Sequence, residues 1–434
     1  MTKLLRRDFF VASASLSAGI YASGVTASPR SSALDLLNIA CVGTANRAAD
    51  DIVGVLSQKI VAVCDIDRKY LNLSRKFIKE RQGHTPAGFD DYREMIDRLG
   101  ARFDAVVVAT ADHHHAPATI RALRAGKHVY CEKPLTHTVH EARLVAEAAE
   151  TAGVATQLGT QMHASNNYRR VVEVIRSGVI GDVEEVHVWV SKTWGGGDRP
   201  KLSDPIPDHL NWDLWLGPAP KRDYKAGLYH PRNWRRWWDF GSGTLGDMAC
   251  HYMDLPFWAL DLTHPSFCRS AGPVLHPDTC PLGLTVYYKF PANNDRPPVD
   301  LTWYDGSMIP REIHGQRVKA NGVMFVGSNG MMFADYGSYK LFPQDKFADF
   351  DAPAKTLPDS VGHYREWILA CRDGSPTTCN FAYSGALTEA VQLGNVAFRT
   401  GEILEWDAEN LKATNTEKAA KFVTKEYRTG WEVV

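Results

Sequence analysis

Residues 36–48 read LLNIACVGTANRA, and this stretch decides the fold of the part of the chain that follows it. The apolar run 36–42 predicts a buried strand that stops at Gly43, and a helix is expected over 47–56. Apolar runs and amphipathic segments then alternate. Strands are expected at 60–64, 105–109, 128–131 and 155–158, and helices at 70–82, 91–99, 115–125 and 138–152. This alternation predicts a doubly wound parallel sheet with helices on both faces.

The turn after the first strand matches a dinucleotide-binding fingerprint in position but only partly in sequence. The Rossmann fingerprint is G-x-G-x-x-G. Here Gly43 is followed by Thr44, Ala45, Asn46 and Arg47, with alanine in both later glycine positions. Each alanine adds a methyl group where the backbone nears the pyrophosphate or packs on the sheet. These five residues are still the expected cofactor contacts of the turn.

Asp65 ends the second expected strand, about 20 residues after Gly43, which is the fingerprint spacing. A carboxylate there accepts hydrogen bonds from the adenosine ribose and repels a 2′-phosphate, so NAD is favoured over NADP. The alternative is that Asp65 and Asp67 cap the following helix. The pattern predicts an NAD-binding Rossmann domain over 35–158.

After about residue 160 strands follow strands, which predicts a second α+β domain with an open, mainly antiparallel sheet. Strands are expected at 183–191, 283–290, 299–304, 323–326 and 331–335. Helices are expected at 166–177, 245–260, 360–371 and 381–400. The loop 192–237 is long and rich in tryptophan, and loops of this length are usually functional or disordered. A substrate-binding and oligomerisation domain is predicted over 159–405, with a C-terminal tail at 406–434.

Residues 1–30 have the composition of an export signal. Arg6 and Arg7 precede Phe9 and Phe10, a weakly apolar stretch follows, and small residues near Ala27 offer a cleavage site. The arginine pair indicates a twin-arginine signal, with an ordinary secretory signal or short anchor as the alternative. A periplasmic or otherwise exported protein is therefore expected, without a stable membrane span. Export of a folded protein would also explain a tightly held cofactor.

The net charge and the spacing of cysteines and histidines argue against some classes of partner. Net charge is -1 and no basic stripe stands out, so no nucleic-acid partner is expected. The spacing of cysteines and histidines indicates no metal site, and consecutive His113, His114 and His115 cannot all face one ion. Disulfides remain open for two pairs in an oxidising compartment, Cys268 with Cys280 and Cys371 with Cys379.

Two stretches of sequence are more specific than the glycine turn as indicators of a protein family. Residues 107–113 read VVATADH and lead to GKHVYCEKPL at 126–135, while 241–251 read GSGTLGDMACH. Together they resemble the Gfo/Idh/MocA family of NAD(P)-dependent oxidoreductases, which includes glucose-fructose oxidoreductase and inositol dehydrogenase. Residues 212–220, WDLWLGPAP, resemble exported members. The resemblance covers about 36–405, and the degenerate glycine turn is its main departure.

The resemblance implies a Rossmann domain followed by an open α/β domain, with the substrate between them. It implies a catalytic set of Lys133, Asp247 and His251, from Glu-Lys-Pro and Asp-x-x-x-His. It also implies a homo-oligomer formed through the open sheet. Position in the family places the remaining cofactor contacts at Thr110, His113, Glu132, Lys133 and Gln161.

The chemistry of the catalytic set can be argued from the residue types. Oxidising an alcohol removes a hydride and a proton, and histidine is the base best suited to neutral pH. Asp247 and His251 are four residues apart and would share a helix face. Lys133 would stabilise an alkoxide as it forms. Alternatively, Lys133 belongs to a surface ion pair with Glu132, and His251 to the core.

Aromatic and cationic residues before the Asp-x-x-x-His motif suggest a sugar pocket. Tryptophan stacks on sugar rings and arginine donates to hydroxyls, so Arg235 and Trp237 are expected substrate contacts, as is Tyr168. Core or oligomer packing is the equal alternative for these side chains.

Three functions remain open. The first is an NAD-dependent oxidoreductase acting on a sugar or polyol. The second is a glycosidase that uses bound NAD to oxidise its substrate transiently, and the third is a non-catalytic nucleotide-binding protein.

Overall fold

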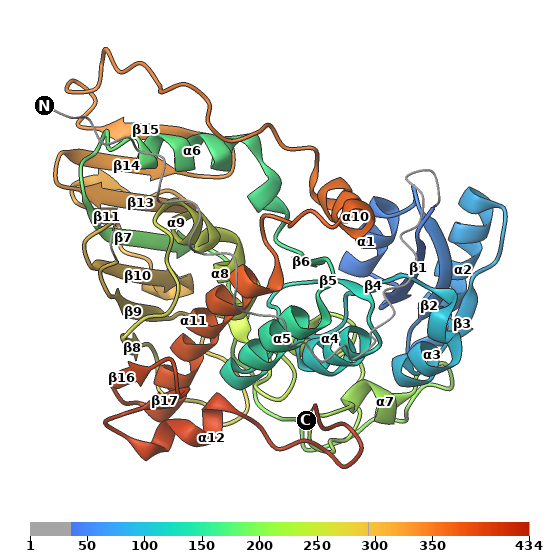
Figure 1. The fold of residues 1–434 in the computed structure, drawn as a ribbon. Coiled ribbons are helices and arrows are strands. Elements are labelled where there is room, and N and C mark those ends of the chain that lie inside the picture. Colours follow the sequence, from blue (N-terminus) through green and yellow to red (C-terminus); the bar gives the residue numbers. More distant parts are fainter. Residues whose placement is uncertain (1–35, 294, 434) are drawn as a thin grey trace, which may run out of the picture. The chain divides into compact units, whose positions relative to one another are not determined.

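The computed structural model of the chain describes residues 36–293 and 295–433 (Figure 1). The export signal expected at 1–30 lies outside the described residues. Two sheets organise the described part, a six-stranded sheet followed along the chain by a nine-stranded one. Among these residues, no helix has both the length and the apolar character to cross a membrane.

The first sheet has the order β3-β2-β1-β4-β5-β6, and every pairing in it is parallel. This confirms the expected doubly wound sheet, whose strand order reverses between β1 and β4. Five of its strands lie where the sequence predicts them, and only β3 was not expected. The six strands are β1 (Asn38–Val42), β2 (Lys59–Cys64), β3 (Ala87–Phe89), β4 (Ala105–Val108), β5 (His128–Cys131) and β6 (Thr156–Leu158).

Some helices of this domain begin at residues whose side chains accept hydrogen bonds from the free N–H groups of the first turn. The Asp67 carboxylate accepts from Lys69 N at the start of α2, and Thr138 and Glu141 form a capping box at the start of α5. These helices are α1 (Arg47–Gly54), α2 (Arg68–Gln82), α3 (Tyr92–Leu99), α4 (His115–Arg124) and α5 (Val139–Ala152).

The second sheet has the order β15-β14-β13-β7-β10-β9-β8-β16-β17. The pair β7 and β10 is parallel and the other pairs are antiparallel, so the expected mainly antiparallel sheet is confirmed. Its strands are β7 (Val183–Val190), β8 (Phe267–Ala271), β9 (Thr285–Phe290), β10 (Val299–Asp305), β13 (Asn321–Gly327), β14 (Gly330–Ala334), β15 (Tyr339–Phe342), β16 (Leu404–Asp407) and β17 (Lys412–Ala413). A separate hairpin pairs β11 (Glu312–Ile313) with β12 (Gln316–Arg317).

Helices cover one face of the second sheet and join it to the first domain. α11 packs against α5 of the Rossmann domain and against α8 and β8 (Figure 1). The helix expected at 245–260 is two helices, because the Pro256 ring would clash with the carbonyl of Tyr252 in a continuous helix. The helices are α6 (Asn166–Arg176), α7 (Trp212–Leu216), α8 (Gly243–Tyr252), α9 (Asp254–Ala259), α10 (His363–Asp373), α11 (Phe381–Thr400) and α12 (Ala420–Val423).

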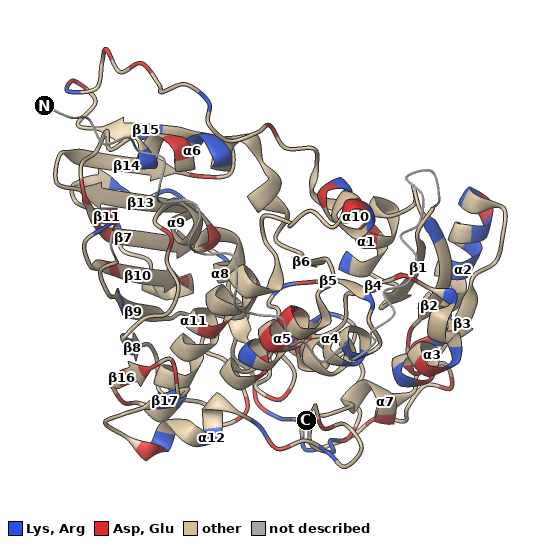
Figure 2. Cartoon of the chain, in the orientation of Figure 1, with Lys and Arg blue, Asp and Glu red and all other residues tan. Residues whose placement is uncertain are grey.

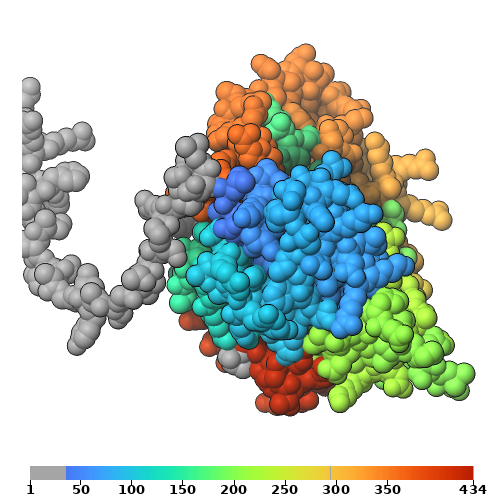
Figure 3. All heavy atoms as spheres, turned by 90° about the vertical axis from the view of Figure 1, so that its right-hand side faces the viewer, coloured from blue at the N-terminus to red at the C-terminus, as the bar shows by residue number. Residues whose placement is uncertain are grey.

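The chain's last residues, expected as a tail, pack against the first domain. Trp431 is buried, and the Arg93 guanidinium lies 3.7 Å from the centroid of its ring. Arg428 donates to the Asp213 carboxylate and to the main chain of α7. Figure 3 shows this segment in red and the long loop in yellow-green against the blue surface of the Rossmann domain.

Lys and Arg residues are interspersed with Asp and Glu residues along the described part of the chain (Figure 2). All eight cysteines are free thiols in the structure. Neither disulfide left open by the sequence is formed, and Cys268 and Cys280 lie in the apolar core.

The turn after β1 requires glycine at position 43. Gly43 has a φ of 92°, and a Cβ there would lie 2.3 Å from the Ala109 carbonyl oxygen. We therefore expect Gly43→Ala to lower the free energy of unfolding by more than about 2 kcal/mol, through φ strain and this clash. Gly83 at the end of α2 is the matched control, because its φ is 75° and a Cβ would meet nothing within 4 Å.

Chemical denaturation of both variants checks this expectation. Gly83→Ala should cost only about 1–2 kcal/mol, since it carries the φ strain alone. Equal losses for the two variants would show that the close approach of β1 and β4 does not constrain the turn.

Candidate functional site

A cleft opens at the carboxyl ends of β1, β2 and β4, where Val42, Cys64 and Ala109 line its floor. Open α/β sheets bind ligands at this place, beside the point where the strand order reverses. The cleft encloses about 880 Å³, its open mouth included, which is the size of a small-molecule site. Its walls include the aromatic side chains of Tyr70, Tyr92, Trp215, His230, Trp234 and Trp431.

The alanines of the turn do not block this cleft. Ala45 contributes to its lining, whereas Ala48 is only 1% exposed and packs beneath Gly43. Within the described residues, the backbone N–H groups of Ala45, Asn46 and Arg47 make no hydrogen bond to protein. They precede and begin α1, so this end of the helix can bind an anion such as a pyrophosphate.

Asp65 lines the cleft and also fixes the turn. Its Oδ2 accepts hydrogen bonds from Thr44 N at 3.0 Å and from Thr44 Oγ1 at 2.6 Å. Burial raises the pKa of Asp65, and the Thr44 hydroxyl acts in the opposite direction. The helix cap that the sequence left as an alternative role belongs to Asp67, while Asp65 faces the cleft with Asp90 and Asp91. These carboxylates would repel the 2′-phosphate of NADP.

Glu132 is buried and holds other expected cofactor contacts in place. Its Oε1 accepts from Arg47 Nε at 3.1 Å and from Gln161 Nε2 at 2.8 Å. Arg47 lines the cleft together with Thr110. The structure therefore brings Arg47, Glu132 and Gln161 into one network beside the cleft, with the Glu132 carboxylate directed into the protein.

The three residues of the expected catalytic set come together at the junction of the two domains. Lys133 follows the carboxyl end of β5, and its Nζ donates to Oδ1 of Asp247 at 2.7 Å and to the main-chain oxygen of Asp247 at 2.9 Å. Asp247 and His251 lie on successive turns of α8. The alternative surface pairing of Glu132 with Lys133 is wrong, since the Lys133 side chain is only 10% exposed and pairs with Asp247.

Asp247 is surrounded by cations. Besides Lys133, the Lys192 ammonium lies 2.6 Å from Oδ2, and Arg235 Nε donates to Oδ1 at 3.2 Å. Trp194 Nε1 donates to Oδ2 at 2.8 Å. Three cations therefore contact this one carboxylate.

These contacts settle the charge states. Burial alone would raise the pKa of Asp247, but Lys133, Arg235 and Lys192 hold it well below its usual range. Burial alone would lower the pKa of Lys133, but the Asp247 carboxylate raises it. The ammonium and the carboxylate are therefore both charged at neutral pH.

His251 is neutral in the same conditions. Burial and the nearby Lys133 ammonium lower the pKa of His251 to about 3, with Asp247 acting in the opposite direction. Its Nδ1 lies 3.5 Å from Oγ1 of Thr160, whose hydroxyl donates to the Cys250 carbonyl. The Thr160 oxygen is thus an acceptor for an Nδ1–H, which leaves the Nε2 lone pair to accept a proton.

Of the expected substrate contacts, only Arg235 faces the cleft. Tyr168 is fully buried, and its hydroxyl donates to the main-chain oxygen of His251, so it supports α8 from behind. Trp237 is also fully buried in the aromatic core of the long loop, where its Nε1 donates to the Leu228 carbonyl. The expectation that Tyr168 and Trp237 line a pocket is therefore corrected, because both rings are buried in apolar packing.

His113 is likewise corrected from a cofactor contact to a core residue. Its ring is fully buried, and its two nitrogens lie 3.2 Å and 3.0 Å from the carbonyl oxygens of Phe240 and Trp215. Burial lowers its pKa well below the usual value. His113 therefore ties the Rossmann domain to the long loop.

Sequence reasoning missed several residues of the site. Lys192 and Trp194 follow the end of β7, and a cation next to an aromatic residue at a strand end is a signal that could have found them. Trp431 lines the cleft from the chain's far end, and no local pattern indicates this.

Comparison with protein families assigns this architecture. Residues 37–160 match the oxidoreductase-family NAD-binding Rossmann fold, and 166–433 match the oxidoreductase-family C-terminal alpha/beta domain of the Gfo/Idh/MocA proteins. The chain belongs to the Gfo/Idh/MocA family of oxidoreductases. Its first domain is an NAD-binding domain, and the free amides of α1 and the carboxylate of Asp65 fit that cofactor.

Individual relatives are more distant. A "Glycosyl hydrolase family 109 protein" of Shewanella sp. (strain W3-18-1) is 24% identical over 212 residues, 42% of this chain and 45% of the relative. "Inositol 2-dehydrogenase" of Salmonella paratyphi B is 29% identical over 199 residues, 43% of this chain and 53% of the relative. The chain spans about half the length of the curated relatives it matches.

Solved structures share the fold. The WlbA dehydrogenase from Bordetella pertussis, in complex with NADH and UDP-GlcNAcA, superposes with a TM-score of 0.58. It is 16% identical, and the match covers 85% of this chain and 98% of that one. At this identity the likeness supports the two-domain architecture alone.

Asp65→Ala should weaken NAD binding by about tenfold, as expected for loss of one or two hydrogen bonds to a ribose and of the turn's anchor. It should also lower the ratio of NAD affinity to NADP affinity. Isothermal titration of both nucleotides checks this.

Thr138→Ala is the matched control, because Thr138 caps α5 of the same domain without lining the cleft. It should cost about 1 kcal/mol of stability and leave NAD affinity unchanged. Equal nucleotide affinities for both variants and the wild type would assign Asp65 a structural role only.

Proposed function

We propose that this protein is an NAD-dependent oxidoreductase that acts on a hydroxyl-bearing carbon of a sugar or polyol. The observation that carries this proposal is the Lys133–Asp247 ion pair, with neutral His251 one helical turn away, beside a cleft that fits NAD. Oxidising an alcohol carbon to a ketone removes a hydride and a proton. Bound NAD supplies the hydride acceptor, so the chain's own residues have to manage the proton and the charge on oxygen.

Lys133 is suited to bind the reacting oxygen. Its ammonium is held by Asp247 in a nearly buried place, and charge stabilisation is strongest where water is excluded. As the hydroxyl loses its proton, the positive charges of Lys133, Lys192 and Arg235 favour the alkoxide. In the reverse direction the same groups polarise a ketone.

His251 is suited to accept the hydroxyl proton. It is neutral at neutral pH, and contact of its Nδ1 with Thr160 leaves Nε2 free. A pKa near 3 makes the ring a weak base in the free protein, so proton transfer to it depends on stabilisation of the alkoxide by Lys133. Asp247 positions the Lys133 ammonium and, through this ion pair, fixes α8 relative to the end of β5.

A sugar or polyol is the proposed substrate class because hydrogen-bonding cations and aromatic faces meet at this place. Arg235 lies 4.2 Å from the Trp234 ring centroid, and both line the cleft. Relatives named for inositol oxidation and glycoside hydrolysis agree with this class.

The proposed setting is outside the cytoplasm. Arg6 and Arg7 and the small residues near Ala27 support export through a twin-arginine signal. A homo-oligomer is also proposed, on the family resemblance alone.

A second candidate is a glycosidase in which NAD oxidises the substrate transiently and the hydride returns. The similarity to glycosyl hydrolase family 109 proteins favours it. Native mass spectrometry of the purified protein, followed by a panel of sugars and aryl glycosides, separates the two. Net NADH from a free sugar supports the oxidoreductase, and aglycone release without net NADH supports the glycosidase. Protein that neither retains nor binds NAD would contradict both.

Lys133→Ala should fold and lose at least about 100-fold in kcat, since it removes the donor that faces the developing alkoxide. Lys192→Ala is the graded comparison, because Lys192 touches the same carboxylate but is 45% exposed. It should cost less than about tenfold in kcat, because water replaces much of an exposed charge. Equal rates for Lys133→Ala and the wild type would remove Lys133 from the mechanism.

The pH profile tests the state of His251. Because its folded pKa lies below the ordinary value, the ring loses its base form only as pH falls towards about 3. The acid limb of kcat/KM should therefore lie well below pH 6, and His251→Ala should lose about 10²–10⁴-fold. A limb near pH 6.5 that disappears in His251→Ala would contradict a buried, neutral base.

A further inference from the structure

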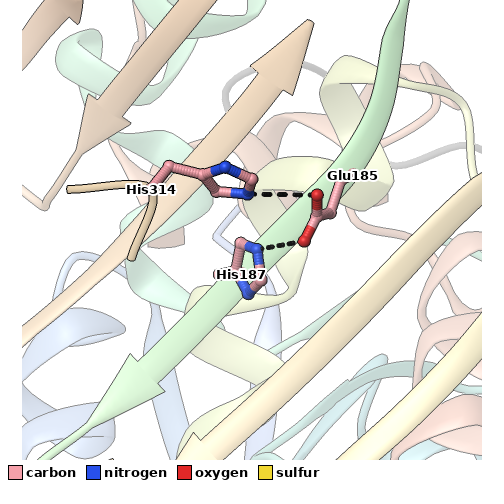
Figure 4. Close-up of side chains that lie close together, drawn as sticks. All are labelled: Glu185, His187 and His314. Atoms are coloured by element: carbon pink, nitrogen blue, oxygen red, sulfur yellow. Dashed lines mark hydrogen bonds and ion pairs between the residues drawn. The ribbon is translucent and has the colours of Figure 1, made fainter. Parts of the chain in front are cut away.

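Three side chains meet on the outer face of the nine-stranded sheet, in a place unrelated to the cleft (Figure 4). Glu185 and His187 are two residues apart on β7, so they project from the same face of the strand. His314 comes from the turn between β11 and β12. One ligand atom from each of the three lies within 4.8 Å of the other two.

The ring nitrogens in this cluster lie close to the carboxylate oxygens, but one of them lacks a hydrogen bond. Nε2 of His187 lies 2.6 Å from Oε1 of Glu185, and Nε2 of His314 lies 3.1 Å from Oε2. Among the described residues, Nε2 of His187 is buried and makes no hydrogen bond by geometric criteria.

The other nitrogen of His187 is already occupied. Nδ1 lies 3.1 Å from the Tyr304 hydroxyl on β10, and the two rings stack with an interplanar angle of 17°. A histidine that binds a metal usually donates its second N–H to such a partner, which fixes the ring and directs the free lone pair at the ion. With Nδ1 in contact with Tyr304, the lone pair of His187 Nε2 is the one that can bind an ion.

The turn that carries His314 is anchored on the sheet. Ile313, its neighbour, is 5% exposed and packs in an apolar cluster with Trp189, Met324 and Phe333. Trp189 Nε1 also donates to the Lys319 carbonyl, on the far side of the hairpin. His314 is therefore held over β7 by packing that does not depend on its own side chain.

We propose that Glu185, His187 and His314 bind one divalent transition-metal ion, with zinc as the preferred occupant. Two imidazoles and one carboxylate are a common zinc ligand set that leaves a fourth position for water. Glu185 and His314 are 38% and 40% exposed, so an ion and its water can enter from solvent.

The ion would join β7 to the β11–β12 hairpin. Because the ligands come from distant segments, no spacing in the sequence indicates the site. The sequence expectation of no metal is revised by this proposal.

Zinc titration of the tag-free protein, stripped with a chelator, tests the proposal. One Zn²⁺ per chain should bind, and thermal unfolding should shift upward with the metal. Glu185→Gln and His314→Asn should each weaken binding by at least about tenfold and lose the thermal shift. Asparagine suits position 314, where φ is 48°.

Two further variants make the test specific. Tyr304→Phe should weaken zinc binding without abolishing it, since it removes only the partner of Nδ1. His140→Ala, on α5, is the control for histidines outside the cluster and should bind zinc as the wild type does. Wild-type protein that binds no Zn²⁺, Co²⁺ or Ni²⁺ would overturn the proposal. Unchanged binding by Glu185→Gln and His314→Asn would overturn it equally.

Discussion

The carboxylate of Asp247 is the contact on which the site depends. It is 4% exposed and lies among Lys133, Lys192 and Arg235, which come from three separate segments of the chain. A buried carboxylate is costly unless it is paired, and loss of a partner from a buried pair costs about 3–5 kcal/mol. The ion pair with Lys133 therefore fixes the end of β5 to α8, and with it one domain to the other.

The rest of the site follows from that junction. The same helix turn that presents Asp247 carries His251, and Tyr168 holds the main chain of His251 from behind. On the Rossmann side, Glu132 next to Lys133 holds Arg47 at the wall of the cleft. Glu132 and Lys133 are adjacent at the end of β5. Glu132 contacts the wall of the cofactor cleft, and Lys133 contacts the helix that carries His251, the proposed proton acceptor. The position of Lys133 therefore depends on both contacts.

Local patterns predicted the parts of this molecule that depend on local physics. The parallel sheet, its helices and the Asp-x-x-x-His helix turn lie where periodicity placed them, because strand and helix burial leaves a mark in the sequence. Short edge strands such as β3 and β17 were missed, since two or three residues carry no period.

Side-chain roles were harder to predict than elements. Tyr168, Trp237 and His113 are residue types found both in pockets and in cores, and only tertiary packing decides between the two. Lys192 and Trp431 reach the site from distant parts of the chain, as do the ligands of the proposed metal site. What the sequence could not show is the direction in which each side chain points once distant segments meet.

A crystal structure of the protein with NAD would test the central claim most directly. We expect the pyrophosphate on the amides of Ala45, Asn46 and Arg47, the adenosine ribose beside Asp65, and the nicotinamide next to Lys133 and His251. A dinucleotide that left Lys133 and His251 remote from the nicotinamide, or that bound outside this cleft, would contradict it.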